Sequence, residues 1–393
     1  MDNLNDRIIY LDNSATTKMD DRVISLLNEL NDNYYANPSS AHKLGFNAEM
    51  KENEYIEKFI KILGCDKDEI IFTSGGTESN NLAIKGVVNT YKKNGNHIIT
   101  TLIEHPSVLE VFHELEKEGF KVTYLNVNSE GRINIDELKN TINDDTILVS
   151  IMHINNEIGS INDLYKIGSV IKEKNINTIF HSDMVQSFSK YFINIKEAKL
   201  DMFSASSHKF NGPKGVGLLY KNKNVRIKPE LLGGGQQNNL RSGTINTFGN
   251  IMMIKAYLLM YEEREQIYKN LSEIHTYFID ELNRLNNEYK DIYINTKDNE
   301  DFSKYIVSVS FKGIKSEVML HSLEEDKIYV SSGSACSTHH KTKSNTLSSI
   351  GLSNDMIDST IRFSFGKYNT KEEIDIVIKA LRKRIEFLRK YHK

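Results

Sequence analysis

Apolar positions along this chain switch repeatedly between two spacings, and the switch marks the expected secondary structure. Short apolar runs bounded by polar or small residues predict strands, and apolar residues three or four positions apart predict helices. In the first half of the chain the two patterns alternate, which indicates right-handed βαβ units and a largely parallel sheet with helices on both faces. The expected strands are residues 8–11, 69–74, 97–102, 122–127, 146–153, 178–181 and 201–204, and the expected helices lie near 78–88, 108–117, 135–142 and 164–174.

The pattern changes after the three glycines at 233–235. An apolar stripe at helical spacing predicts one long helix over about residues 250–285. Further strands and helices follow, and the last helix begins with a capping box formed by Thr370 and Glu373. We therefore expect a large domain over residues 14–260. A smaller α+β domain would combine residues 1–13 with 261–393 and carry a cysteine-containing loop.

Composition excludes several classes of protein. The 393 residues are 39% hydrophobic and 26% charged, which is ordinary for a globular protein. A net charge of −3 gives no basic footprint for nucleic acid, no apolar run is long enough to cross a membrane, and the N-terminus lacks the apolar region of a signal peptide. Two cysteines, Cys65 and Cys336, predict no disulfide framework, so we expect a cytoplasmic protein in which one cysteine could be a free reactive thiol.

Lys209 lies in a turn that is crowded with small residues. It follows a short apolar strand and a serine-rich stretch, and Gly212, Gly215 and Gly217 come soon after it. Glycines let backbone and ligand approach closely, which suits an amine held at the back of a pocket. There burial lowers the pKa of the amine and makes it nucleophilic toward a carbonyl. The alternative is a solvated lysine on a tight hairpin.

Two stretches that follow expected strands could bind a charged ligand. Residues 73–77 form a Gly-rich turn before a helix, whose free N–H groups and positive dipole end favour an anion. The stretch matches neither a Walker loop nor a dinucleotide fingerprint, and a plain turn is the alternative. Asp183 ends another strand, at the sheet edge where ligands bind in open α/β folds. It could hold a proton on a heterocyclic nitrogen or only cap a helix.

Two more polar groups follow strands. His105 precedes a proline, so its backbone is expected to be extended, and a capping or packing role is the alternative to a functional one. Asn155, Asn156 and Glu157 supply two amides and a carboxylate. These could orient a ring hydroxyl or a ligand carboxylate, or they could make an Asx turn.

Cys336 differs from Cys65 in its surroundings. It lies in a run of small residues, 331–338, that is followed by two histidines and two lysines. Exposure and nearby cations favour the thiolate form, whereas Cys65 adjoins an apolar helix end. Cys336 is therefore the expected reactive thiol, and an incidental cysteine on a solvated loop is the alternative.

An anion site, an acid, a histidine, an amide pair and a lysine thus follow strands of one expected parallel sheet. A pyridoxal phosphate (PLP) site needs this set, because the phosphate takes a helix N-terminus, the pyridinium nitrogen takes an acid, and the aldehyde takes a lysine as a Schiff base. The ring stacks on a flat side chain. A dehydrogenase is disfavoured because the chain has no dinucleotide fingerprint.

The sequence resembles the NifS/IscS-like cysteine desulfurases, class V members of the fold-type I PLP enzymes. The resemblance runs nearly from end to end. It rests on YLDNSATT, NPSSAH, IIFTSGGTESNNLAIKG, IEHPSVL, MHINNEIGSI, HSDMVQS, SSHKFNGPKGVG, GGGQQNNLRSGT, VSSGSAC and IRFSFGKYNT. It implies an α/β fold in which a large domain with a mostly parallel, seven-stranded sheet is joined to a smaller α+β domain.

The resemblance also implies residue roles. Lys209 would hold PLP as the Schiff base, His105 would stack on the ring and relay protons, and Cys336 would carry sulfur as a persulfide. The remaining implied cofactor contacts are Asp183 at the ring nitrogen, Asn156 and Gln186 near the ring hydroxyl, and Gly76, Thr77, Ser206 and His208 around the phosphate.

Two further implied roles concern the substrate and the assembly. Arg362, helped by Asn37, would bind the substrate carboxylate, a bidentate task that suits arginine better than lysine. Thr244 matches a residue that reaches the phosphate of a neighbouring subunit, which implies a homodimer.

The implied activity converts L-cysteine to L-alanine and passes sulfur from Cys336 to an acceptor protein, for iron–sulfur cluster assembly or tRNA thiolation. A selenocysteine lyase or another class V PLP enzyme is one alternative. A degenerate homologue acting as a binding subunit is another, and the joint presence of Lys209, Asp183, His105, Arg362 and Cys336 argues against it. No resident metal site is expected, and the one metal contact considered is a transient contact of Cys336 with an iron–sulfur cluster.

Overall fold

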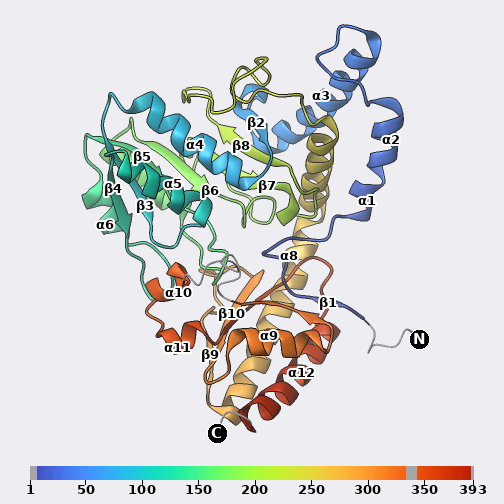
Figure 1. Ribbon diagram of the computed structural model, residues 1–393, viewed down its shortest axis with the longest axis vertical. Coiled ribbons are helices and arrows are strands. Elements are labelled where there is room, and N and C mark those ends of the chain that lie inside the picture. The colour runs from blue at the N-terminus through green and yellow to red at the C-terminus, as the bar shows by residue number, and fades with distance from the viewer. Residues whose placement is uncertain (1–6, 333–342, 391–393) are drawn as a thin grey trace.

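A seven-stranded sheet forms the centre of the larger part of the molecule (Figure 1). The computed structural model describes residues 7–332 and 343–390. The strand order is β2-β8-β7-β6-β5-β3-β4, and β8 alone in this sheet runs antiparallel to its neighbours. The strands are β2 (Ile70–Thr73), β3 (His97–Thr101), β4 (Lys121–Leu125), β5 (Thr146–Ser150), β6 (Ile179–Asp183), β7 (Met202–Ser206) and β8 (Gly217–Lys221). The prediction of a mostly parallel seven-stranded sheet is confirmed.

Helices cover both faces of this sheet, so its strands are apolar on both sides. Side chains alternate between the faces along each strand. Ile98, Leu148 and Met202 pack with helices α4 (Gly76–Tyr91) and α5 (Pro106–Lys117). Their chain neighbours on the same strands pack on the other face, in the core shared with α6 (Ile135–Thr141), α7 (Leu164–Lys174) and α8 (Thr247–Tyr289).

A second sheet of four strands forms the centre of the smaller part. Its order is β12-β13-β10-β9, all antiparallel, built from β9 (Ile292–Ile294), β10 (Ile306–Phe311), β12 (Ser331–Ser332) and β13 (Thr360–Ser364). Its helices are α9 (Ser316–Glu324), α10 (Asn345–Ser349), α11 (Asn354–Ile357) and α12 (Lys371–Lys390). The predicted capping box before α12 is confirmed, because the Thr370 N–H donates to Glu373 (3.2 Å) and the Glu373 N–H donates back to the Thr370 hydroxyl (3.4 Å).

The N-terminal segment reaches both parts of the molecule. Strand β1 (Ile9–Tyr10) pairs in parallel with β11 (Ile328–Tyr329), beside the smaller sheet. The chain then runs along the larger part through α1 (Asp21–Ile24), α2 (Leu26–Asn33) and α3 (Lys43–Leu63) before it enters β2. Short 3-10 turns, η2 (Lys67–Glu69) and η3 (Ser207–Lys209), complete the described elements.

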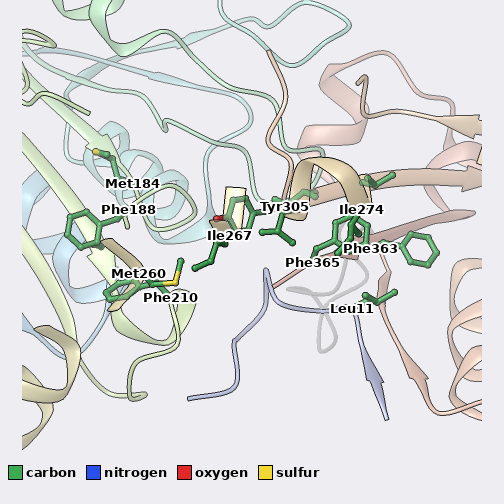
Figure 2. Close-up of a cluster of buried hydrophobic side chains, with 14 of the residues drawn as sticks. Leu11, Met184, Phe188, Phe210, Met260, Ile267, Ile274, Tyr305, Phe363 and Phe365 are labelled. Atoms are coloured by element: carbon green, nitrogen blue, oxygen red, sulfur yellow. The ribbon is translucent and has the colours of Figure 1, made fainter. Parts of the chain in front are cut away.

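Helix α8 joins the two parts. It begins at an Asn246 cap and ends where Lys290 adopts a left-handed conformation, so it is longer at both ends than the predicted 250–285. Figure 2 shows apolar side chains continuing from Phe188 and Met260 past Ile267 and Ile274 to Phe363. The two parts therefore share one continuous core.

We propose that the small domain consists of residues 1–13 with 261–393 and the large domain of residues 14–260. The pairing of β1 with β11 and the bridge of Asp12 to Ser364 support the inclusion of the N-terminal strand in the small domain. Within residues 7–332 and 343–390, no helix combines the length and apolar content that a membrane span requires.

Candidate active site

A cavity of about 390 Å³ lies where the carboxyl ends of the larger sheet meet the N-terminal segment and β13. Most of the residues predicted for the site line this cavity. They are Gly76, Thr77, His105, Asn156, Asp183, Gln186, Ser206, His208, Lys209 and Arg362. Cys336 lies outside the described residues.

Asp183 is the last residue of β6 and is only 4% exposed. Its two carboxylate oxygens accept from the Val185 N–H (2.9 Å) and from the Asn80 side-chain amide (2.8 Å). Both donors are neutral, and no ion pair joins the carboxylate to a cationic side chain within residues 7–332 and 343–390. It keeps its negative charge available to a cationic group in the cavity.

His105 is held in one orientation at the start of α5. It caps that helix, and its Nδ1 accepts from the Ser107 N–H (3.1 Å) and contacts the Ser107 hydroxyl (2.8 Å). Because a backbone N–H donates to Nδ1, the neutral ring carries its proton on Nε2. Burial lowers the pKa of His105, Asp183 opposes this effect and Lys209 adds to it. The neutral ring therefore predominates at neutral pH. His105 therefore does cap the helix, as the alternative prediction stated, and its Nε2 remains able to contact a ligand.

Lys209 ends η3 and lines the cavity, so it does not stand on a solvated hairpin. Its Nζ donates to the carbonyl oxygens of Ser14 and Ala15, at 2.9 Å from the latter. Gln186 also donates to the Ser14 carbonyl (3.0 Å). The turn needs glycine at 212, because a Cβ there would lie 2.0 Å from the Ser207 hydroxyl. The small residues thus serve close packing behind the lysine.

A second lysine, Lys190, lies near Lys209 but does not line the cavity. Lys190 is buried, and its Nζ lies 4.9 Å from the ring centre of Tyr305. Burial and, secondarily, the charge of Lys209 lower the pKa of Lys190 to about 7. The region around Lys209 therefore disfavours further positive charge.

The start of α4 lines the cavity beside the end of β7. Gly76, at the first turn of the helix, and Ser206, at the end of β7, line the cavity on one side, with Thr77 and His208 beside them. A Cβ on Gly76 would lie 2.6 Å from a Val185 methyl, so only glycine allows this approach. Burial and the nearby lysines lower the pKa of His208 to about 4, so this imidazole is neutral.

Arg362 forms the opposite wall. It lies on β13, is 5% exposed, and donates to the Asn156 carbonyl (2.8 Å) and to the Asp12 carboxylate (2.9 Å). Glu157 lies near it, and burial raises the pKa of Glu157 to about 7, although Ser344 and Arg362 favour the ionised form. Asn155 takes the Asx-turn alternative, because its side-chain oxygen accepts from the N–H groups of 157 and 158.

Two predicted residues do not reach the cavity within one chain. Thr244 is exposed in the segment after the glycines, and Asn37 is exposed and accepts from the Ser39 N–H (2.9 Å). Their neighbours Pro38 and Ile245 both line a larger cavity of about 840 Å³. Thr244 and Asn37 therefore adjoin this larger cavity and do not line the one that contains Arg362.

Several site residues were missed by the sequence reasoning. Asn80 donates to both Asp183 and Ser107, and the Ser14 carbonyl joins Lys209 to Gln186. Glu104 is fully buried beside His105, and burial raises its pKa to about 8. Asn80 and Glu104 could have been found in the sequence, because each is a polar residue within an apolar helix or at the end of an apolar strand. The role of the Ser14 carbonyl could not, because the sequence does not mark a backbone group.

Comparison with known proteins identifies the family. The aminotransferase class-V family model matches residues 9–377. The chain is 42% identical to cysteine desulfurase IscS of Dictyoglomus turgidum over 383 residues, which cover 98% of this chain and 96% of that protein. The chain belongs to the NifS/IscS-like cysteine desulfurases of the class V aminotransferase family.

Solved structures of this desulfurase family share the fold. A NifS-like protein superposes with a TM-score of 0.89 at 37% identity and covers 97% of this chain and 99% of its own. SspA in complex with cysteine gives a TM-score of 0.78 at 32% identity, over 92% of this chain and 100% of its own. The resemblance read from the motifs is thus confirmed, and this class V family is PLP-dependent.

In the described part of the chain, histidine, cysteine and acidic side chains do not gather in a group of three or more that could hold a metal ion.

Proposed function

We propose that this protein is a PLP-dependent cysteine desulfurase that converts L-cysteine to L-alanine and collects the sulfur on Cys336 as a persulfide. The observation that carries the proposal is the convergence of Lys209, Asp183, His105 and Arg362 on one cavity. The desulfurase names of the relatives and the cysteine complex of SspA support the substrate.

The residues present fit PLP. The buried Gln186 Oε1 has no hydrogen-bond partner among the described residues, and it belongs to a side chain that lines the cavity. Asp183 offers a carboxylate with neutral partners, and Gly76 lies in the first turn of α4 at the cavity, where free N–H groups favour an anion. Lys209 would hold the aldehyde, Asp183 the ring nitrogen, and Gly76, Thr77, Ser206 and His208 the phosphate, with Asn156 and Gln186 near the ring hydroxyl.

When bound, PLP supplies an electron sink for bond cleavage at the substrate. Arg362 binds and orients the substrate carboxylate. Lys209 or His105 moves the α-proton, since both side chains line the cavity and the neutral His105 ring carries its proton on Nε2. Asp183 keeps a negative charge fixed against the cationic ring nitrogen, which favours the electron-rich transition state.

The sulfur step belongs to Cys336. Its thiolate attacks the substrate sulfur, so an S–S bond forms as the C–S bond breaks and its electron pair is left on the carbon that becomes the methyl group of alanine. Cys65 is not a rival thiol, because burial raises its pKa to about 12.

We also propose a homodimer, a sulfur-acceptor protein and a cytoplasmic setting. Phe46 is 57% exposed and lines the larger cavity beside the neighbours of Thr244 and Asn37, and an exposed apolar surface of this kind favours contact with a second copy. A second copy would bring Thr244 to the partner's phosphate site. The acceptor would serve iron–sulfur cluster assembly or tRNA thiolation, and a reducing compartment preserves the thiol.

The test compares two cysteine variants of the PLP-loaded protein. Cys336→Ala is expected to abolish sulfide release from L-cysteine while leaving the visible absorbance that borohydride removes. Cys65→Ala, the matched control, is expected to retain release. A colourless wild type that takes up no PLP, or release that survives in Cys336→Ala, would contradict the proposal.

A further inference from the structure

Arg362 is occupied by the chain itself. One terminal nitrogen of its guanidinium donates to the Asn156 carbonyl and the other to the Asp12 carboxylate, at 2.8 and 2.9 Å. Asp12 lines the same cavity as Arg362, and its side chain is 21% exposed there. Arg362 Nε is buried and has no hydrogen-bond partner among the described residues. The cavity thus holds an arginine that already has an internal carboxylate partner and still has N–H groups without one among the described residues.

A second carboxyl group lies near Arg362 without pairing with it. Glu157 follows Asn156 in the chain and lies near enough for the Arg362 charge to favour its ionised form. A ligand carboxylate that binds Arg362 therefore enters a site in which the Asp12 carboxylate already pairs with the guanidinium. Like charges that share one cation repel each other, so the incoming group competes with Asp12 for the same attraction.

We propose that Asp12 is a specificity-determining residue, an internal counter-ion of Arg362 that the substrate carboxylate displaces on binding. The inference rests on the proposed function, because it takes the substrate to be a small amino acid with a free carboxylate. A ligand that has a carboxylate binds the Arg362 guanidinium in place of the Asp12 carboxylate. A ligand without a carboxylate leaves the Asp12–Arg362 ion pair intact and gains no binding energy from Arg362. The pair thus sets the carboxylate affinity of the site.

The side chain of Asp12 can be changed without disturbing its backbone contacts. Its carbonyl accepts from the Tyr10 hydroxyl (3.1 Å) and from the Ala15 N–H (3.0 Å), and both bonds survive a side-chain substitution. Asp12→Asn removes the negative charge that faces Arg362 and keeps a side-chain oxygen that can accept the same hydrogen bond. A matched control is Asp301→Asn, which breaks an Asp–Arg pair with Arg132 (2.6 Å) that does not line this cavity.

The experiment measures dissociation constants by calorimetry on PLP-loaded protein, with two probes that each lack one group of cysteine. 3-Mercaptopropionate has the carboxylate and no amine, and cysteamine has the amine and no carboxylate. Asp12→Asn is expected to bind 3-mercaptopropionate about tenfold more tightly than wild type, which is the effect of about one screened ion pair. Cysteamine binding and the Asp301→Asn variant are expected to show no change.

Two further variants complete the test. In an Arg362→Gln background, Asp12→Asn should have no effect on 3-mercaptopropionate binding, because the shared cation is gone. Asp12→Ser is measured in the same way if Asp12→Asn does not fold. Unchanged or weaker binding of 3-mercaptopropionate in the Asp12 variants would overturn the proposal and would show that Asp12 only positions Arg362. Failure of the desulfurase proposal is separate, because it is seen in the wild type as absence of PLP uptake or sulfide release.

Discussion

The two sides of the cavity, one formed by the larger sheet and the other by β13, differ in how their charged side chains are paired. On the wall formed by the larger sheet, Asp183 is a carboxylate whose hydrogen bonds come from a backbone N–H and an asparagine amide. On the wall formed by β13, Arg362 is a cation already paired with Asp12 inside the chain. The carboxylate of Asp183 accepts only from neutral donors. The guanidinium of Arg362 already has a carboxylate partner, which a ligand carboxylate would have to displace.

This difference fits what each wall would bind. A resident cofactor stays in place, so a fixed charge at its ring nitrogen costs no rearrangement in each cycle. A substrate enters and leaves in every turnover, so a counter-ion that moderates Arg362 prevents carboxylates from being held too tightly. Glu104, behind the first wall, is kept neutral at pH 7 by burial, which leaves Asp183 as the charged acid of that wall.

The largest expected effect is on the first wall. Asp183→Asn removes the charge opposite the ring nitrogen, and kcat should fall about 10³-fold, corresponding to roughly 4 kcal/mol for a broken buried pair. Steady-state sulfide release measures this. Asp201→Asn is the matched control, because Asp201 is an acid that pairs with Lys172 and accepts from the Phe180 N–H without lining the cavity. A kcat for Asp183→Asn within tenfold of wild type would show that the fixed charge is unimportant.

The next effect is on the second wall. Arg362→Lys replaces a planar bidentate group with a point charge, so KM for L-cysteine should rise about 100-fold while kcat changes much less. Initial rates over a range of cysteine concentrations separate the two constants. Arg384→Lys is the control, because Arg384 pairs with Asp326 and Glu325 (2.8 and 2.7 Å) outside the cavity. A fall in kcat at constant KM would contradict the carboxylate role.

The smallest effect concerns Glu104. Burial raises its pKa from 4.5 to about 8, so the folded state keeps a proton that the unfolded state has lost. Stability should therefore fall as pH rises from 4.5 to 8, and Glu104→Gln should remove that fall, gaining about 1–2 kcal/mol over wild type at pH 8.5. Urea unfolding at pH 5.5 and 8.5 measures it.

Glu130→Gln is the contrast for this prediction. Ion pairs with Lys297 and Arg132 lower the pKa of Glu130, so its loss should slightly reduce stability at neutral pH, the opposite sign. Equal stability of Glu104→Gln and wild type at both pH values would mean that Glu104 is ionised in the folded protein.

By itself the sequence determined the fold class and one wall of the site. Alternating strand and helix patterns set the sheet, and Asp183, His105 and Gly76 follow strands whose carboxyl ends must meet at one edge, so local pattern was sufficient to group them. Strand β8 was not predicted, because it follows the glycine-rich turn after Lys209 directly, and an apolar run would not have shown its antiparallel direction. The predicted end of α8 at 285 fell short, because a polar helix turn resembles a loop in pattern.

Only the tertiary structure decided what Arg362 and Lys209 contact. Asp12 is 350 residues from Arg362 in the chain, and the Ser14 carbonyl is 195 residues from Lys209, so neither pairing leaves a periodic signal in the sequence. The pairings arise because β1 joins the smaller part of the molecule and carries the next residues into the cavity. The burial that raises the pKa of Glu104 and of Glu157 has the same origin, since it depends on which elements pack around a side chain and not on its neighbours in sequence.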